Sequence, residues 1–233
     1  MKRILRRAGV LVSRYDPIRD PEMVRMRFFQ TLEINVVFDV GANTGQFASA
    51  LRADGYRGRI ISFEPLSSAF RALQARSSDD PNWLVEQCAL GESHGTAEIN
   101  ISGNSYSSSL LPMLPRLREA APESAYVATE QIRITPLDTL FSRYCAPRDK
   151  AFLKIDTQGY TNSVLRGARS SLPHISGLQV ELSLVPLYEN EPLIGEVVSK
   201  LEQEGFRLVL VKPEFTDNTT GQQLQVDGVF FRL

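Results

Sequence analysis

The 233-residue chain has few of the features that mark secreted, membrane-spanning or nucleic-acid-binding proteins. Its two cysteines, Cys88 and Cys145, lie far apart and form neither a disulfide framework nor a metal-binding spacing, which predicts a reducing, cytoplasmic location. No apolar run approaches the roughly 20 residues that span a bilayer. With a net charge of −1 the chain has no overall positive charge that would attract a polyanion, so we expect no nucleic-acid partner.

Positive charge is concentrated near the N-terminus. Residues 1–30 contain eight Lys or Arg against three Asp or Glu, a balance of +5 that leaves −6 for the rest of the chain. With the short apolar run at 8–12, this pattern predicts a basic amphipathic helix, and we treat residues 1–30 as an extension of a domain formed by residues 31–233. One interpretation is peripheral contact of residues 1–27 with the anionic inner membrane face or a lipid-linked substrate. The other is a solvated helix on the domain edge, or a cover over an active site.

The most informative stretch runs from Val36 to Gly45. An apolar run at 34–38, typical of a strand buried on both faces, stops at Asp39, and a helical pattern begins after two glycines. A glycine turn between a strand and a helix lets a ligand approach the backbone closely, next to free N–H groups at the positive end of the helix dipole. The predicted ligand contacts in this stretch are Asp39, Gly41, Ala42, Asn43 and Gly45.

The spacing of this stretch distinguishes two cofactors. Asp39 precedes the first glycine, whereas the dinucleotide fingerprint G-x-G-x-x-G seats a pyrophosphate without an acid at that point. A carboxylate there repels a pyrophosphate but suits the cationic amino-acid part of S-adenosylmethionine (SAM). The pattern Asp39-x-Gly41-x-Asn43-x-Gly45 also resembles motif I of class I methyltransferases. An NAD(P)-dependent oxidoreductase is the alternative.

Two later segments extend the predicted cofactor site. Residues 59–63 read as the next buried strand, which ends in Glu64-Pro65. An acid at this strand tip is placed to accept both ribose hydroxyls, so Glu64 and the adjoining Pro65 are predicted cofactor contacts. Cys88, near the end of a third strand-like segment, is a candidate for contact with the adenine.

The remaining pattern alternates strands with helices and ends in a hairpin. It predicts an α/β fold, a doubly wound sheet with helices on both faces and an antiparallel last strand. Residues 103–128, which are rich in serine and then interrupted by prolines, predict a loop insertion on the substrate side, with a plain surface loop as the alternative. The candidate substrate contacts are Asn104, Ser107, Ser108 and Ser109.

A second strand–acid–glycine–helix unit contains the candidate catalytic residues. The short strand at 151–155 includes Lys154 and ends at Asp156, a further cofactor contact. An alcohol attacks poorly until its proton is partly removed, so the site needs a base. We assign that role to Asp156, with Lys154 and Glu181 orienting it, because both histidines fall in turns. In an alternative, Asp156 and Glu181 hold a Mg²⁺ ion that acidifies the acceptor hydroxyl.

Several motifs are spread along the chain: Phe38–Gly45, Phe63–Pro65, Ser107–Leu110, Pro136–Leu140, Phe152–Asp156 with Gly159, Val164–Ala168, Glu181 and Asp227 before Val229. Together these motifs resemble the FkbM family of SAM-dependent methyltransferases, from about residue 34 to the C-terminus. The resemblance implies a seven-stranded Rossmann-like sheet in the order 3-2-1-4-5-7-6 and O-methylation of a sugar or polyketide-type hydroxyl. One departure concerns the stretch after Asp156, where the family usually has Asp-x-Glu-Gly-x-Glu but this chain has Gln158 and Thr161.

The sequence therefore predicts a SAM-dependent O-methyltransferase that acts on a hydroxyl of a glycan, a glycolipid or a related secondary metabolite. The alternatives are a non-catalytic or membrane-docked SAM-binding protein and, less favoured, an oxidoreductase. The expected partner is a small-molecule or glycolipid acceptor, and the sequence leaves the oligomeric state open.

Overall fold

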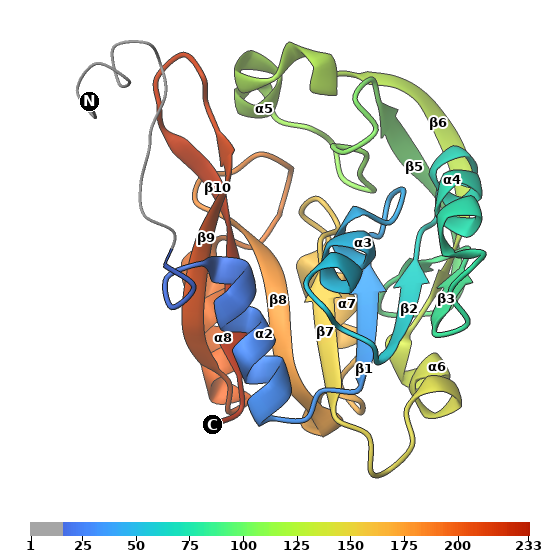
Figure 1. The fold of residues 1–233 in the computed structure, drawn as a ribbon. Coiled ribbons are helices and arrows are strands. Elements are labelled where there is room, and N and C mark those ends of the chain that lie inside the picture. The colour runs from blue at the N-terminus through green and yellow to red at the C-terminus, as the bar shows by residue number, and fades with distance from the viewer. Residues whose placement is uncertain (1–15) are drawn as a thin grey trace.

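A computed structural model describes residues 16–233 as a twisted central sheet covered by helices (Figure 1). The basic helix predicted near the N-terminus falls largely on residues outside this range. The sheet has seven strands in the order β3-β2-β1-β7-β8-β10-β9, and β10 runs antiparallel to both of its neighbours. Numbered within the sheet, this is 3-2-1-4-5-7-6, which confirms the predicted fold. The strands are β1 (Val36–Val40), β2 (Arg59–Phe63), β3 (Trp83–Glu86), β7 (Ala151–Ile155), β8 (Ile175–Ser183), β9 (Arg207–Thr216) and β10 (Gln223–Phe231).

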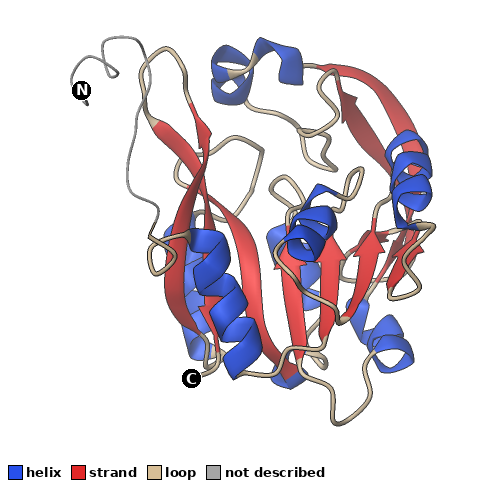
Figure 2. Ribbon diagram, viewed as in Figure 1, coloured by secondary structure: helices blue, strands red, loops and turns tan. Residues whose placement is uncertain are grey.

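Helices cover both faces of the sheet (Figure 2). One apolar cluster joins side chains of α2, α3 and α4 to one face, and a second joins α6, α7 and α8 to the other. Every residue of β1 and β7 is buried, because these central strands pack under helices on both sides. The helices are α2 (Pro21–Thr31), α3 (Gln46–Ala53), α4 (Ser67–Ser77), α6 (Leu137–Tyr144), α7 (Thr161–Arg166) and α8 (Ile194–Gln203).

Helix α2 packs as part of the domain, although it falls within the range assigned to the basic extension. Asp20 caps it by accepting a hydrogen bond from the backbone N–H of Met23, at 3.0 Å. The ring of Phe29 packs 4.6 Å from that of Phe152 in β7, centroid to centroid. Residues 21–31 therefore contribute to the core of the domain. The boundary predicted at residue 30, between a basic extension and the domain, stays a prediction.

A second, three-stranded sheet stands beside the main one, in the order β4-β6-β5. Its strands are β4 (Ala89–Leu90), β5 (Gly95–Ser102) and β6 (Tyr126–Thr135). The chain between β5 and β6 contains the short helices α5 (Pro115–Ala120) and η1 (Pro122–Ser124), and it lies above the carboxyl ends of the central strands (Figure 1). The predicted insertion at 103–128 corresponds to this segment, except that β6 already begins at Tyr126.

Among residues 16–233, no helix has both the length and the apolar character needed to cross a membrane.

Candidate functional site

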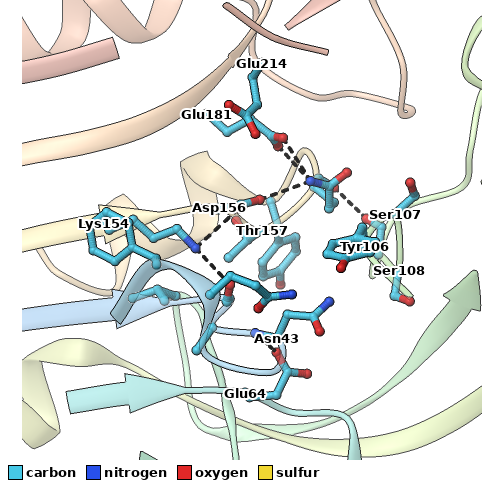
Figure 3. Close-up of a pocket in the computed structure, with 18 of the residues that line it drawn as sticks. Asn43, Glu64, Tyr106, Ser107, Ser108, Lys154, Asp156, Thr157, Glu181 and Glu214 are labelled. Atoms are coloured by element: carbon cyan, nitrogen blue, oxygen red, sulfur yellow. Dashed lines mark hydrogen bonds and ion pairs between the residues drawn. The ribbon is translucent and has the colours of Figure 1, made fainter. Parts of the chain in front are cut away.

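A cavity of about 570 Å³ lies at the carboxyl ends of the central strands, where open α/β sheets bind their ligands. Figure 3 shows Asn43 and Glu64 at one end of it, and Glu181 and Glu214 at the other. We call these the β1–β2 end and the β8–β10 end, and the latter also includes Asp227. The serine-rich loop at 104–110 forms a side wall.

The wall at the β1–β2 end is the turn after β1, in which three residues have left-handed backbone. The φ angles are +73° at Gly41, +48° at Asn43 and +88° at Gly45. A Cβ atom on Gly41 would lie only 1.8 Å from the carbonyl oxygen of Asp156. Position 41 therefore requires glycine for two reasons, the steric clash with that oxygen and the positive φ. Gly41, Ala42 and Asn43 line the cavity, whereas Gly45 packs against the ring of Trp83.

Glu64, a predicted cofactor contact, lies in this wall. Its carboxylate accepts hydrogen bonds from the backbone N–H groups of Asn43 at 2.8 Å and Leu66 at 2.9 Å. Burial raises the pKa of Glu64 to about 7, and these two hydrogen bonds oppose the shift. Each oxygen keeps a lone pair for a ligand hydroxyl, and the adjoining Pro65 also lines the cavity.

Asp39 lies beneath the cavity wall, where its side chain is fully buried. It accepts a hydrogen bond from Ser62 at 2.9 Å, and Ser62 in turn accepts one from the indole of Trp83 at 3.0 Å. Burial raises the pKa of Asp39, and the nearby ammonium of Lys154, 3.4 Å away, opposes that shift. Its charge therefore acts on the cavity through Lys154, in contrast to the direct ligand contact that we expected.

Lys154 connects Asp39 to Asp156, as Figure 3 shows for its contact with Asp156. Its ammonium donates to the carbonyl oxygen of Gly41 at 2.9 Å and lies 3.3 Å from the Asp156 carboxylate. Burial alone would lower the pKa of Lys154, but the carboxylates of Asp156 and Asp39 outweigh it and raise that pKa. Lys154 is therefore a fixed cation, and it cannot be the base.

Asp156 is the accessible carboxylate of this group, with 39% of its side chain exposed. Its other neighbour is Gln158, whose amide nitrogen lies 3.0 Å from Asp156 and 3.0 Å from both carboxylate oxygens of Glu181. Within residues 16–233 no group of three or more His, Cys, Asp or Glu side chains is arranged to hold a metal ion. The Mg²⁺ alternative that we assigned to Asp156 and Glu181 thus finds no support, because an amide hydrogen-bond donor occupies the place between them.

At the β8–β10 end the carboxyl groups are held by residues that the sequence did not indicate. Asp227 accepts a hydrogen bond from Gln179 at 2.9 Å, and Gln179 accepts one from Arg25 of α2 at 3.0 Å. Burial, followed by the charges of Asp156 and Glu214, raises the pKa of Asp227 to about 7. No local motif marks Arg25 or Gln179, since their partners are distant in the sequence.

The predicted substrate residues of the loop line the cavity, but their polar groups are mostly engaged within the protein. The side chain of Asn104 accepts from the backbone of Ser107 at 3.1 Å, and the hydroxyl of Ser108 donates to the carbonyl of Ser105 at 3.1 Å. The hydroxyl of Ser109 donates to the carbonyl of Gln158 at 2.6 Å. These residues therefore shape the wall and fix the loop to the sheet.

Cys88 is also placed away from the cavity. Its side chain is buried in the apolar cluster under α6, α7 and α8, and burial raises the pKa of its thiol to about 11. The next two residues, Ala89 and Leu90, line the cavity instead. A candidate wall for the adenine therefore exists after β3, but it is apolar.

A seven-stranded sheet in this order, with a glycine turn after β1 and a cavity at the strand ends, defines the class I methyltransferase fold. A family model described as the methyltransferase FkbM domain matches residues 39–208, so the chain belongs to the FkbM methyltransferase family. This membership confirms the resemblance drawn from the motifs, and it argues against the oxidoreductase alternative.

One solved structure supports the fold. A proposed methyltransferase from Thermobifida fusca YX is 12% identical, with a TM-score of 0.50 over 93% of this chain and 80% of that one. An rRNA methylase from Streptococcus thermophilus (10% identity, TM-score 0.49, 95% and 99% of the two chains) and a glycopeptide N-methyltransferase complexed with sinefungin (11%, 0.44, 92% and 83%) are more remote. No curated protein matches the sequence.

Proposed function

We propose that this methyltransferase uses SAM and methylates a hydroxyl group of a sugar unit in a glycan, a glycolipid or a related secondary metabolite. The observation that carries the cofactor assignment is the carboxylate of Glu64 beside the glycine turn at the β1–β2 end of the cavity. Its two oxygens accept one backbone N–H each, from Asn43 and from Leu66, and each keeps a lone pair for a ligand hydroxyl. The two hydroxyls of a nucleoside ribose supply such donors.

The charges along the cavity support an acceptor that is not an anion. Its lining includes seven acidic residues but only three basic ones, Arg25, Lys154 and Lys212. Burial raises the pKa of Glu64 and of Asp227 to about 7 and that of Glu181 well above its ordinary value, so near neutral pH the negative excess is smaller than this count of acids. The remaining excess disfavours a phosphate-bearing acceptor relative to an uncharged polyhydroxylated or a cationic one. The acidic residues are Glu22, Glu64, Glu123, Asp156, Glu181, Glu214 and Asp227.

The reaction requires positioning and the removal of one proton. SAM, when bound, supplies an electrophilic methyl group. Glu64 and the turn from Gly41 to Asn43 would hold the nucleoside, and Asp156 would accept the proton of the acceptor hydroxyl as that oxygen takes up the methyl group. The ammonium of Lys154 holds Asp156 from below, and general-base assistance of this kind contributes about 10²–10⁴-fold to a rate.

Calorimetric titration with SAM tests the cofactor assignment. We expect Glu64→Gln to weaken binding about 10- to 100-fold, because a charged acceptor for two hydroxyls is lost. The matched control is Glu98→Gln, since Glu98 is exposed on β5 and does not line the cavity. Wild-type protein that does not bind SAM, or a Glu64 variant that binds like the control, would refute the assignment.

The acceptor class is tested by transfer of labelled methyl groups from SAM to a panel of neutral, amine-bearing and phosphorylated glycans and glycolipids. Label is expected in neutral or amine-bearing members and absent from phosphorylated ones. Tight SAM binding with no transfer to any member would favour the non-catalytic alternative.

A further inference from the structure

The amide group of Gln158 lies between two carboxylates that would otherwise face each other. Its nitrogen donates to Asp156 at 3.0 Å and to Glu181 at 3.0 Å. Asp156 is the residue after β7, and Glu181 lies in β8, so the amide connects the tips of two adjacent strands. A neutral donor shared by two acids reduces their mutual repulsion without adding a charge.

The orientation of this amide is fixed by groups on its other side. The hydroxyl of the buried Tyr188 donates to the Gln158 side-chain oxygen at 2.7 Å, so the nitrogen is the atom that faces the carboxylates. The hydroxyl of Ser109 donates to the Gln158 carbonyl at 2.6 Å, and the residue has a φ of +49°. A non-glycine residue in this left-handed region is strained, and it keeps that conformation only where its surroundings hold it. The contacts with Tyr188 and Ser109 therefore fix Gln158 in place.

The same position is the one that a cation shared by the two acids would need. Mg²⁺ binds oxygen ligands at about 2.0–2.1 Å, and Ca²⁺ at about 2.3–2.6 Å. The Gln158 nitrogen is equidistant, at 3.0 Å, from the nearest Asp156 oxygen and from both oxygens of Glu181, which is hydrogen-bond spacing. A cation and the amide nitrogen of Gln158 therefore cannot occupy this position at the same time.

We propose that Gln158 is a positioning residue that takes the place of a divalent cation in this site. It holds one oxygen of Asp156 while Lys154 holds the other, which fixes the carboxylate plane toward the cavity. The site then works without a metal ion. The catalytic meaning of this arrangement rests on the proposed methyl transfer, but the arrangement itself can be tested without SAM or an acceptor.

The first test is Mn²⁺ binding to the full chain, followed by electron paramagnetic resonance. The wild-type protein is expected to bind no Mn²⁺ at this site, whereas Gln158→Glu, which brings three carboxylates together, is expected to bind one ion per chain. Gln74→Glu is the matched control, because Gln74 is exposed on α4. Stoichiometric binding by the wild-type protein, or no binding by a folded Gln158→Glu variant, would overturn the proposal.

The second test is the pH dependence of the melting temperature of Gln158→Met, which retains the side-chain length but has no N–H donor. Burial raises the pKa of Glu181 well above its ordinary value, so this carboxyl ionises only as the pH rises, and in the variant the ionised form lacks the N–H donor that the wild-type amide supplies. The deficit relative to the wild-type protein should therefore grow with rising pH, by about 5 °C once Glu181 is ionised. A deficit that is constant with pH would indicate packing alone and contradict the proposal. If the protein does not bind SAM but both of these results are obtained, the proposed function is refuted and the proposed role of the Gln158 amide still stands.

Discussion

At the β1–β2 end of the cavity the wall is largely main chain, whereas at the β8–β10 end it consists of side chains that hold one another. The first end depends on the turn from Gly41 to Gly45 and on Glu64, which accepts from two backbone N–H groups. The second depends on hydrogen bonds such as Arg25 to Gln179, between residues 154 positions apart. The proposed function places the cofactor at the rigid backbone end and the acceptor at the side-chain end, where substitutions change the surface readily.

The largest expected effect concerns the backbone end. Gly41→Ala should destabilise the protein by at least about 3 kcal/mol, because a Cβ atom meets the Asp156 carbonyl oxygen in addition to the left-handed strain. Gly55→Ala is the control, since Gly55 has a φ of +95° with nothing within 4 Å of the added Cβ, and it should cost about 1 kcal/mol. Urea unfolding measures both. Equal losses would show that the close approach to Asp156 does not matter.

The next effect concerns the side-chain end. Arg25→Met should destabilise the protein by about 2 kcal/mol, because Gln179 loses its buried charged donor and Asp54 its ion pair. Arg27→Met, on the exposed side of the same helix, should change stability by less than about 0.5 kcal/mol. Urea unfolding of the two variants is the measurement. A harmless Arg25 substitution would mean that α2 is held by its apolar face alone.

A pH effect should distinguish the buried acids from exposed ones. Because the folded pKa of Asp227 is about 7, above its ordinary value of 3.8, the folded protein keeps a proton that the unfolded chain has lost. Its contribution to stability is full below about pH 4 and is lost as the pH rises through 7, by at most about 1.4 kcal/mol per pH unit.

Asp227→Asn should therefore flatten the decline in unfolding free energy between pH 5 and pH 8, and the exposed Asp79→Asn should leave it unchanged. Glu64 contributes a similar decline, so some slope should persist in the Asp227 variant. Denaturant unfolding at several pH values decides this point. Parallel curves for the wild-type protein and Asp227→Asn would contradict the expectation.

The smallest effect on stability is expected at the cavity mouth. Tyr106 is 63% exposed in the serine-rich loop and lines the cavity (Figure 3). Tyr106→Ala should change the free energy of unfolding by less than about 0.5 kcal/mol but raise the KM for the acceptor several-fold with kcat little changed, because an aromatic surface for a sugar ring is lost. Steady-state kinetics with an acceptor found in the panel give the answer. A change in kcat alone would place Tyr106 in the chemical step instead.

The contrast between the two ends also explains which site residues were predictable. Gly41 and Glu64 follow from short motifs, since a glycine turn depends on its own backbone and a strand-end acid on its position directly after the strand. The placement of Asp39 did not follow, because the neighbouring strands decide which way it faces: it pairs in register with Ser62 of β2 and Lys154 of β7 and is buried between them. Cys88 was likewise assigned by its position after β3, while packing turned it into the core.

By itself, the sequence determined the alternation of strands and helices, the glycine turn after β1 and the acids at the strand tips, because each depends on residues close together in the chain. Only the tertiary structure decided that the Gln158 amide bridges Asp156 and Glu181, and that Arg25 reaches Gln179. The contacts of Gln158 with Glu181 and of Arg25 with Gln179 join segments distant in the sequence, and they depend on strand register and helix packing, which no local pattern encodes.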